Sequence, residues 1–236
     1  MTCTLKSHSL GPTMVLTLSD PTAQHYLNAS VCIAGTEAIN AAERNADVRS
    51  VILTSDGQHF CQGVAPKTSP ADFNETAQAL DTWCDTLRQF SKPVLVAVEG
   101  ACVGGGLALA LSADLVVAAH NSRWVQEGTL AGHLPLGGSS AWLQQQLPRP
   151  LAMALLMGGV RLNVQRLLNA GLISHICEPG SALHDAHDIA ARLNAQPQAQ
   201  LASIKELFNL AEHDSPTQVR KQELAVIAQS SSWTSR

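Results

Sequence analysis

EGACVGGGLALA, residues 99–110, is the most informative stretch of the chain, and it directly follows the apolar run VLVAV at residues 94–98. A short apolar run rich in valine is typical of a buried strand. The glycines that follow let the chain turn tightly into a helix, whose first turn leaves backbone N–H groups unpaired. This junction can therefore bind a negatively charged oxygen, although the glycines could also serve only to pack the helix closely on a sheet.

A second loop that can offer backbone N–H groups lies upstream, at HFCQGV (residues 59–64). It comes just after the strand-like run VILT at residues 51–54. It also contains a glycine, so a reacting group can approach its main chain closely. Two loops that follow two strands can supply two N–H groups to one oxygen. This pairing points to a site that stabilises negative charge.

The composition agrees with a soluble enzyme of one main domain but does not by itself indicate an enzyme. The chain has 236 residues, 45% of them hydrophobic and 14% charged, which is enough for a substantial core. A net charge of -4 and a pI near 6.1 argue against a nucleic-acid surface, which needs clustered Lys and Arg. No apolar run reaches the roughly 18 to 20 residues of a membrane span, and the amino terminus lacks the basic-then-apolar order of a signal peptide. We therefore expect a cytoplasmic protein with no membrane contact.

The cysteines are scattered along the chain and form no CxxC pair. We therefore expect reduced, mostly buried thiols and no structural metal. Cys61 lies in the second loop, where a reactive thiol is conceivable, but burial as a small apolar residue is the simpler interpretation. Ser139 and Ser140 lie outside any GxSxG turn, so the sequence gives little support to a serine nucleophile.

Short β-branched runs alternate with longer helical patterns, which predicts an α/β layer fold. We expect strands at 13–18, 50–54, 94–98 and 114–118, and helices at 30–44 and 72–90. After Gly137 the pattern becomes almost wholly helical, and Pro179-Gly180 marks the start of the last three helices. The predicted later helices cover 139–147, 151–157, 164–170, 182–194, 198–211 and 217–230.

Two sets of apolar residues recur at helical spacing. The set in the helix at 72–90 predicts core packing rather than a ligand site, and it consists of Phe73, Leu80, Trp83, Cys84 and Leu87. The set after Pro179 is larger than a peripheral helix normally leaves in water and predicts contact between subunits. It consists of Leu201, Ile204, Leu207, Phe208, Leu224 and Ile227. The alternative is that these residues fold back onto their own domain.

Several segments together resemble the crotonase superfamily, the enoyl-CoA hydratase/isomerase family, and the resemblance covers nearly the whole chain. They are MVLTLSDP (14–21), DVRSVILT (47–54), FCQG (60–63), KPVLVAVEG (92–100), ADLVVAA (113–119), GHLPLGGS (132–139) and ASIKEL (202–207). The region 148–207 is most similar to bacterial members described as enoyl-CoA hydratase or alternative-type oxepin-CoA hydrolase.

The resemblance implies a crotonase fold, a ClpP/crotonase-like spiral of ββα units with a carboxy-terminal helical trimerisation region. It divides the chain into a core at 1–178, with the acyl-CoA site, and a helical oligomerisation region at 179–236. In the family that region packs subunits into trimers, often paired into hexamers. The implied substrate is a coenzyme A thioester of fatty acid or aromatic acid metabolism, with no permanently bound cofactor and no metal.

The resemblance also assigns the two glycine loops. It implies that the backbone N–H groups of Val64 and Gly105 form an oxyanion hole for the thioester oxygen. Two fixed donors stabilise an enolate-like oxygen without reorganisation. The alternative for Val64 is an ordinary loop residue.

The acid/base groups of the family do not carry over. Hydratases of the family have two glutamates, and the matching positions here are Ala108 and Gly128. Some isomerases and ring-opening relatives use an Asp where this chain has Leu136. Hydration by the two-glutamate route is therefore not expected. Glu127, beside Gly128, and His133 are candidate substitutes; the alternatives are a solvated loop glutamate and a histidine packed against a turn.

Two lysines are candidates for binding CoA phosphates. Lys67 follows the second loop, and Lys205 resembles a family lysine that approaches the phosphates from the helical region. The alternative for both is a surface charge.

Two functions remain open at this point. The first is an acyl-CoA enzyme that stabilises a thioester enolate and uses an unusual or substrate-supplied proton donor. The second is a catalytically silent relative that binds CoA esters or assembles with an active paralogue. The retained loops favour the first, and the empty acid/base positions favour the second.

Overall fold

The computed structural model describes residues 2–65, 68–126 and 134–229. Its centre is a six-stranded sheet in the order β1-β2-β3-β4-β6-β9, parallel throughout except for the antiparallel pair β1 and β2. These strands are β1 (Thr4–Leu10), β2 (Thr13–Ser19), β3 (Ser50–Ser55), β4 (Val94–Val98), β6 (Leu115–Ala119) and β9 (His175–Cys177). A smaller sheet has the order β5-β7-β8, with β5 (Ala101–Val103), β7 (Arg123–Val125) and β8 (Leu162–Asn163).

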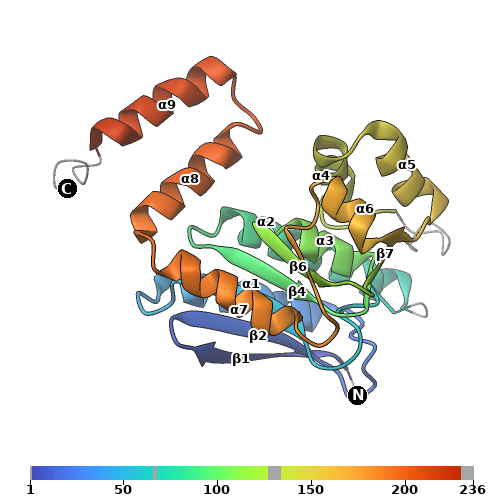
Figure 1. Ribbon diagram of the computed structural model, residues 1–236. Helices are drawn as coiled ribbons and strands as arrows, with labels where there is room; N and C mark the ends of the chain where they lie inside the picture. Colours follow the sequence, from blue (N-terminus) through green and yellow to red (C-terminus); the bar gives the residue numbers. More distant parts are fainter. Residues whose placement is uncertain (1, 66–67, 127–133, 230–236) are drawn as a thin grey trace.

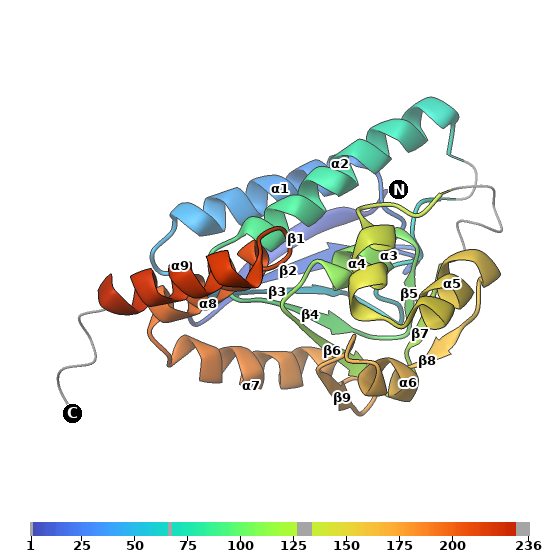
Figure 2. The same cartoon turned by 90° about the horizontal axis from the view of Figure 1, so that it is seen from above.

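Helices cover both faces of the larger sheet (Figures 1 and 2). Helices α1 (Ala29–Arg44) and α2 (Pro70–Gln89) lie together on one face, and α7 (Ala182–Asn194) lies on the other. The position of strand β4 between two helical layers explains why its sequence is continuously apolar. Val94, Val96 and Val98 join the core under α1 and α2, whereas Leu95 and Ala97 pack with the alanines of α7. Both faces of the strand are buried, as expected for a parallel sheet covered on both sides.

Helices α1 and α2 pack closely because a glycine faces an aromatic ring. A Cβ atom on Gly35 would collide with the ring of Trp83, so only glycine fits at this crossing. Asn28 caps α1 by accepting a hydrogen bond from Val31 N at 2.9 Å. Ser69 caps α2 and is followed by Pro70, a residue suited to the first helical position.

The remaining helices are α3 (Gly105–Leu111), α4 (Ser139–Gln146), α5 (Arg149–Gly158), α6 (Val164–Asn169), α8 (Gln198–Leu210) and α9 (Pro216–Gln229). The predicted strands and helices agree with these bounds to within one or two residues. The expectation that the chain is almost wholly helical after Gly137 is confirmed for the described residues, and the exceptions are the strands β8 and β9. Both strands are very short and pair with β7 and β6.

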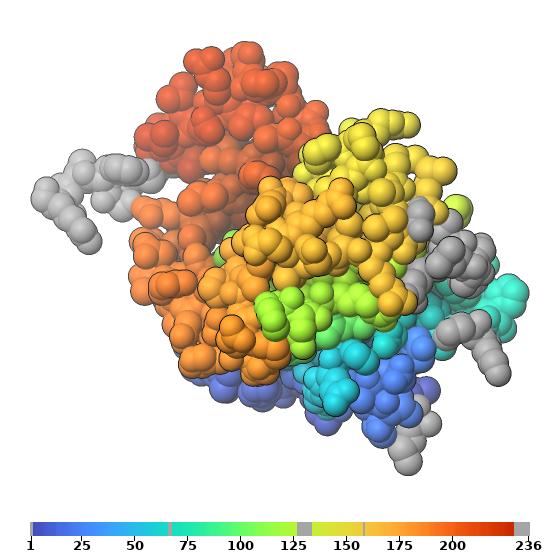
Figure 3. All heavy atoms as spheres, turned by 45° about the vertical axis from the view of Figure 1, so that its right-hand side comes forward, coloured from blue at the N-terminus to red at the C-terminus, as the bar shows by residue number. Residues whose placement is uncertain are grey.

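Helices α8 and α9 form an arm at the carboxy-terminal end of the described chain. In Figure 3 their atoms, orange-red to red, make a lobe at the top of the molecule. No residue of α8 is buried, and Ile204 and Phe208 are 63% and 71% exposed. Leu224 and Ile227 of α9 are also exposed, so these four residues do not fold back onto their own domain. Within the described part of the chain, no helix has the length and apolar character needed to cross a membrane.

Candidate functional site

The smaller sheet brings the two glycine loops together. Cys61 N donates to Ala101 O at 3.0 Å, and Val103 N donates to Cys61 O at 2.9 Å. The loop at 59–64 therefore runs beside β5 as an additional parallel segment, with Cys61 opposite Cys102. Strand β5 leads directly into Gly104 and α3, so the ends of both loops lie next to each other.

Gly63 and Gly104 allow this close approach. Both have positive φ angles, +81° and +51°, which favour glycine. A Cβ atom on Gly63 would lie 3.2 Å from Val103 O and 3.7 Å from Gly105 N. The residue before Val64 is thus in contact with the backbone that begins α3.

The backbone pairing of Leu27 determines where the Val64 N–H points. Leu27 pairs with Val64 in a parallel bridge, and Leu27 N donates to Gly63 O at 2.7 Å. In this type of bridge Leu27 forms its backbone hydrogen bonds with the residues before and after Val64. The N–H of Val64 itself therefore points away from Leu27. Gly105 is the first residue of α3, where an N–H has no acceptor within the helix. Neither N–H has a protein acceptor among the described residues.

Two of the three positions that the resemblance matches to acid/base residues lie in apolar surroundings. Ala108 is 0% exposed, and a Cβ atom on Gly137 would lie 2.9 Å from its Cβ and 2.9 Å from Cys84 Sγ. Leu136 is partly buried against the same core. Neither position holds a titratable group. Gly128, Glu127, His133 and Lys67 lie outside the described residues.

The ammonium group of Lys205, a candidate for binding CoA phosphates, is paired with groups of the protein itself. Its Nζ lies 2.9 Å from Asp114 Oδ2 and also donates to the backbone oxygens of Leu87 and Lys92. Burial lowers the pKa of Lys205 and raises that of Asp114, and their mutual attraction opposes both shifts. This ion pair fastens α8 to the main body, so the geometry does not support Lys205 as a CoA-phosphate ligand.

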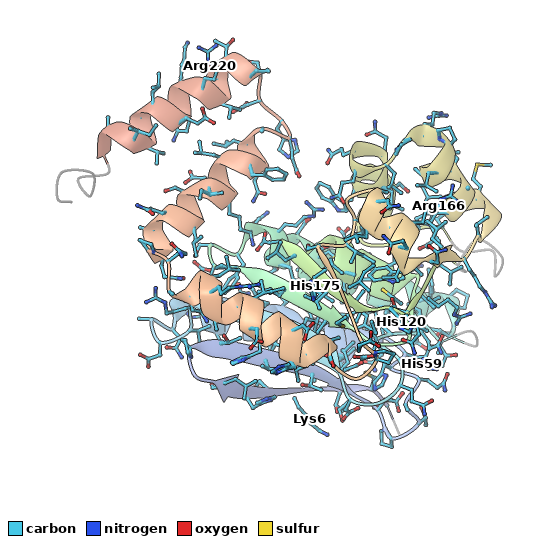
Figure 4. The ribbon with its side chains drawn as sticks, viewed as in Figure 1. Lys6, His59, His120, Arg166, His175 and Arg220 are labelled. Atoms are coloured by element: carbon cyan, nitrogen blue, oxygen red, sulfur yellow. The ribbon has the colours of Figure 1, made fainter. Side chains whose placement is uncertain are left out.

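Three other polar side chains in or near the segments discussed above form hydrogen bonds with the backbone. His59, labelled in Figure 4, accepts a hydrogen bond from Ala101 N at its Nδ1. Ser139 Oγ donates to Leu136 O. Cys61 is fully buried, as expected; burial raises the pKa of its thiol to about 12, and its Sγ accepts from Gly63 N at 3.3 Å. These contacts hold the loops in place and argue against a thiolate nucleophile.

Gln126 is a buried polar residue that the sequence prediction missed. It follows β7 directly and is 1% exposed, and its Oε1 has no hydrogen-bond partner among the described residues. The preceding residue, Val125, accepts the N–H of Gly104 at 3.1 Å, so Gln126 lies at the edge of the glycine turn. In the sequence, the only indication of Gln126 was that a polar residue ends an apolar strand run.

Two large cavities among the described residues lie away from Val64 and Gly105. One of about 510 Å³ lies beneath α8, where its lining includes Arg88, Asp114 and Lys205; the other, about 540 Å³, lies against α2 and α8. No group of three or more His, Cys, Asp or Glu side chains suited to a metal ion occurs among the described residues.

Comparison with known proteins gives one consistent result. The sequence profile described as enoyl-CoA hydratase/isomerase matches residues 11–235. The crystal structure of an enoyl-CoA hydratase from a Polaromonas species has a TM-score of 0.91 at 40% identity, covering 95% of this chain and 90% of that one. An enoyl-CoA hydratase of Mycobacterium tuberculosis is 29% identical over 86% of this chain and 81% of its own length.

A relative named for a different activity is almost equally similar. The 1,2-epoxyphenylacetyl-CoA isomerase of Escherichia coli is 28% identical over 87% of this chain and 82% of its own length. The profile match and the structural likeness extend over nearly all elements described above, including the glycine loops and the helical arm. The chain therefore has the crotonase fold and belongs to the enoyl-CoA hydratase/isomerase family.

Proposed function

We propose that this protein is an acyl-CoA enzyme in which the backbone N–H groups of Val64 and Gly105 bind the thioester oxygen. The observation that carries the proposal is the contact between the two loops. Gly63 lies against Val103 and Gly105, and the pairing with Leu27 turns the Val64 N–H away from the sheet partner. Two donors from two loops can then meet at one oxygen.

Such a pair of donors changes the chemistry of a thioester. Negative charge drawn onto the carbonyl oxygen makes the neighbouring carbon acidic and a conjugated carbon electrophilic. The donors are fixed before the reaction and do not reorganise, and each is worth about 2.7 to 4 kcal/mol in well-studied oxyanion holes. The reaction is therefore one that passes through an enolate, on substrates of the kind that the relatives' names give, enoyl-CoA or aromatic acyl-CoA thioesters.

The source of protons separates this protein from a two-glutamate hydratase. Ala108 and Leu136 supply no acid or base, and their surroundings are apolar. Reactions that depend mainly on enolate stabilisation, or in which the substrate supplies the proton, need no carboxylate at these positions. Glu127 and His133 remain candidates, and Gln126 can orient a water molecule or a substrate through its amide group.

The second candidate is a catalytically silent relative that binds CoA esters or assembles with an active paralogue. The complete burial of Ala108 favours it, because general acid/base groups typically contribute roughly 10²- to 10⁴-fold in rate. The intact glycine loops favour the enzyme. Turnover distinguishes the enzyme from either form of the silent relative, and binding of the thioester distinguishes the two silent forms.

For the assembly, we propose a homotrimer or a dimer of trimers built through the helical region at 179–236. The exposed apolar side chains Ile204, Phe208, Leu224 and Ile227 support this proposal. They leave an exposed apolar surface on the arm.

The proposal is tested by incubating the purified protein with a panel of saturated, unsaturated and aromatic acyl-CoAs, with mass-spectrometric readout of both binding and product. Turnover of at least one thioester, abolished when Gly105 is changed to Pro, supports the enzyme, because proline has no N–H group to donate. Binding without any turnover supports the silent relative. Absence of binding to every acyl-CoA contradicts the enzyme and the silent relative that binds CoA esters, and leaves only assembly with an active paralogue.

A further inference from the structure

A buried histidine lies behind the Val64 loop and is held by two carboxylates. His25 is 0% exposed; its Nε2 lies 3.1 Å from Asp56 Oδ1, and its backbone N donates to Asp20 Oδ2 at 3.0 Å. Because an ionised carboxylate only accepts, Nε2 carries the proton in this pair. Its Nδ1 is buried and finds no hydrogen-bond partner in the part of the chain that the structure describes. The mechanism proposed above uses none of these groups.

Asp56 is the centre of this cluster. Its Oδ2 accepts from Ser19 Oγ at 2.5 Å and from Lys6 Nζ at 3.4 Å, the latter from β1, at the lower edge of Figure 4. Desolvation raises the pKa of Asp56, but the hydrogen bonds from Ser19, His25 and Lys6 outweigh it and lower the pKa to about 2. The carboxylate is therefore charged at neutral pH and holds the imidazole N–H firmly.

These side chains are the types found in serine hydrolases, but their order excludes that chemistry. In such an enzyme the histidine stands between the serine and the carboxylate and takes the serine proton. Here Asp56 stands between Ser19 and His25, and the hydroxyl donates to the carboxylate. The arrangement orients His25 and does not activate Ser19.

The segment around His25 has an unusual backbone conformation. Ala23 and His25 both have positive φ angles, +52° and +50°, a region that residues other than glycine seldom adopt. Such a conformation persists only where the surrounding structure holds it. Here the hydrogen bonds to Asp20 and the pair with Asp56 hold it, and the curled segment leads directly to Leu27.

The segment around His25, together with its partner Asp56, contacts both ends of the loop that carries Val64. Asp56 follows β3 and begins the connection that leads to the loop. Further along, Gln62 N donates to Gln24 O at 3.2 Å, and Leu27 N donates to Gly63 O at 2.7 Å. His25 lies between Gln24 and Leu27 in sequence, so its side chain joins the start of the loop to the segment that pairs with the end of the loop.

We propose that His25 is a positioning residue for the oxyanion hole. Through its pair with Asp56 it fixes the backbone at 24–27, which in turn fixes Gly63 and the direction of the Val64 N–H. The inference rests on the proposed function of Val64 and adds a residue that never contacts the substrate. A misplacement of about 1 Å far from the reacting atoms can cost roughly 10²-fold in rate, so a residue in this place has a measurable effect.

The test uses para-dimethylaminocinnamoyl-CoA, a coloured thioester whose absorption moves to longer wavelength as negative charge collects on its carbonyl oxygen. Its red shift at saturation and its Kd are measured for the native protein and for His25→Leu, His25→Gln and Asp56→Ala. We expect His25→Leu and Asp56→Ala to bind with a Kd within about threefold of native yet lose most of the red shift. His25→Gln should recover it, since the glutamine amide nitrogen reaches the place of Nε2.

The matched control is Asp185→Ala, which removes the carboxylate partner of His175, a second His–Asp pair with 2.9 Å between its atoms. His175 is on β9 (Figure 4), and this variant should keep the full red shift. Asp56 has a side chain that is 45% exposed, so Asp56→Ala decides the question if His25→Leu does not fold. A full red shift in folded Asp56→Ala or His25→Leu overturns the inference alone. A native protein that binds the thioester without any red shift overturns the proposed oxyanion hole instead.

Discussion

Gly63 and Val103 approach each other so closely that a Cβ atom on Gly63 would lie 3.2 Å from the Val103 carbonyl oxygen. Gly63 also has a φ of +81°, which L side chains seldom adopt. The Gly63→Ala substitution must therefore move the loop away from β5 and turn the Val64 N–H. We expect kcat for any thioester that the protein converts to fall by about 10²- to 10³-fold, the loss typical of one oxyanion donor.

The matched control for this substitution is Gly171→Ala. Gly171 has a similar φ of +84°, but a Cβ atom there would have no neighbour within 4 Å. It tests backbone strain without displacement of the loop. Equal losses of activity in the two variants, measured by steady-state kinetics, would show that strain and not the oxyanion loop is responsible.

If Ala108 and Gly128 stand at the positions of the two glutamates of family hydratases, as we propose, hydration of crotonyl-CoA should be very slow in the native protein. We expect the double variant Ala108→Glu with Gly128→Glu to raise the rate, by up to about 10²- to 10⁴-fold for a well-placed acid/base pair. Ala108 lies in the core near Cys84 and Gly137, so the new carboxyl should also lower the Tm. Spectrophotometric loss of the enoyl-CoA absorbance measures the rate, with Ala108→Gln and Gly128→Gln as the uncharged control.

A native rate of roughly 1 to 10³ turnovers per second on crotonyl-CoA would contradict this prediction. It would mean that other groups perform the proton transfers. Glu127 and His133 would then be the first residues to substitute.

Lys205 and Asp114 should be coupled in a double-mutant cycle of unfolding free energies. Lys205→Met leaves the carboxylate of Asp114 without its ammonium partner at 2.9 Å. We expect a loss somewhat below the about 3–5 kcal/mol of fully buried pairs, because the Asp114 side chain is 33% exposed. Adding Asp114→Asn should recover part of that loss. Urea unfolding measures all four proteins, and additive losses would contradict the pairing.

Four of the six strands of the larger sheet, β2, β3, β4 and β6, were predictable, unlike the three-residue β9, because they are apolar runs buried on both faces. Strand β1 was not, since TLKSHSL is mostly polar and largely exposed at the edge of the sheet. The strands β5, β7 and β8 have only two or three residues each, too few for a periodic pattern. They form because the loop at Cys61 and the chain after β6 supply backbone partners.

The candidate site was predictable only as far as its position in the chain. The two glycine loops could be found from the order of strands and glycines and from the family resemblance. The direction of the Val64 N–H depends on Leu27, far away in sequence, and Lys205 binds Asp114, a partner 91 residues away. His25 gave no signal at all, because its role depends on a contact with Asp56 that only folding creates.

The apolar arm should determine the oligomeric state. Phe208→Glu places a charge on a residue that is 71% exposed in the single chain, so it should not harm the fold of the subunit. We expect light scattering with size-exclusion chromatography to give three or six times the 25.0 kDa chain mass for the native protein and a lower mass for this variant. Ile33→Glu, a similar change on α1, is the control. A native mass of a single chain at all concentrations would contradict the proposed assembly.

The most direct measurement is a crystal structure of the protein with a bound acyl-CoA analogue whose thioester sulfur is replaced by a methylene group, which keeps the carbonyl but resists cleavage. We predict that the carbonyl oxygen lies about 2.7 to 3.1 Å from both Val64 N and Gly105 N, the distance range of oxyanion donors. A bound analogue whose oxygen lies away from these two atoms, or amides that point apart or donate to the protein in the complex, would contradict the proposed oxyanion hole.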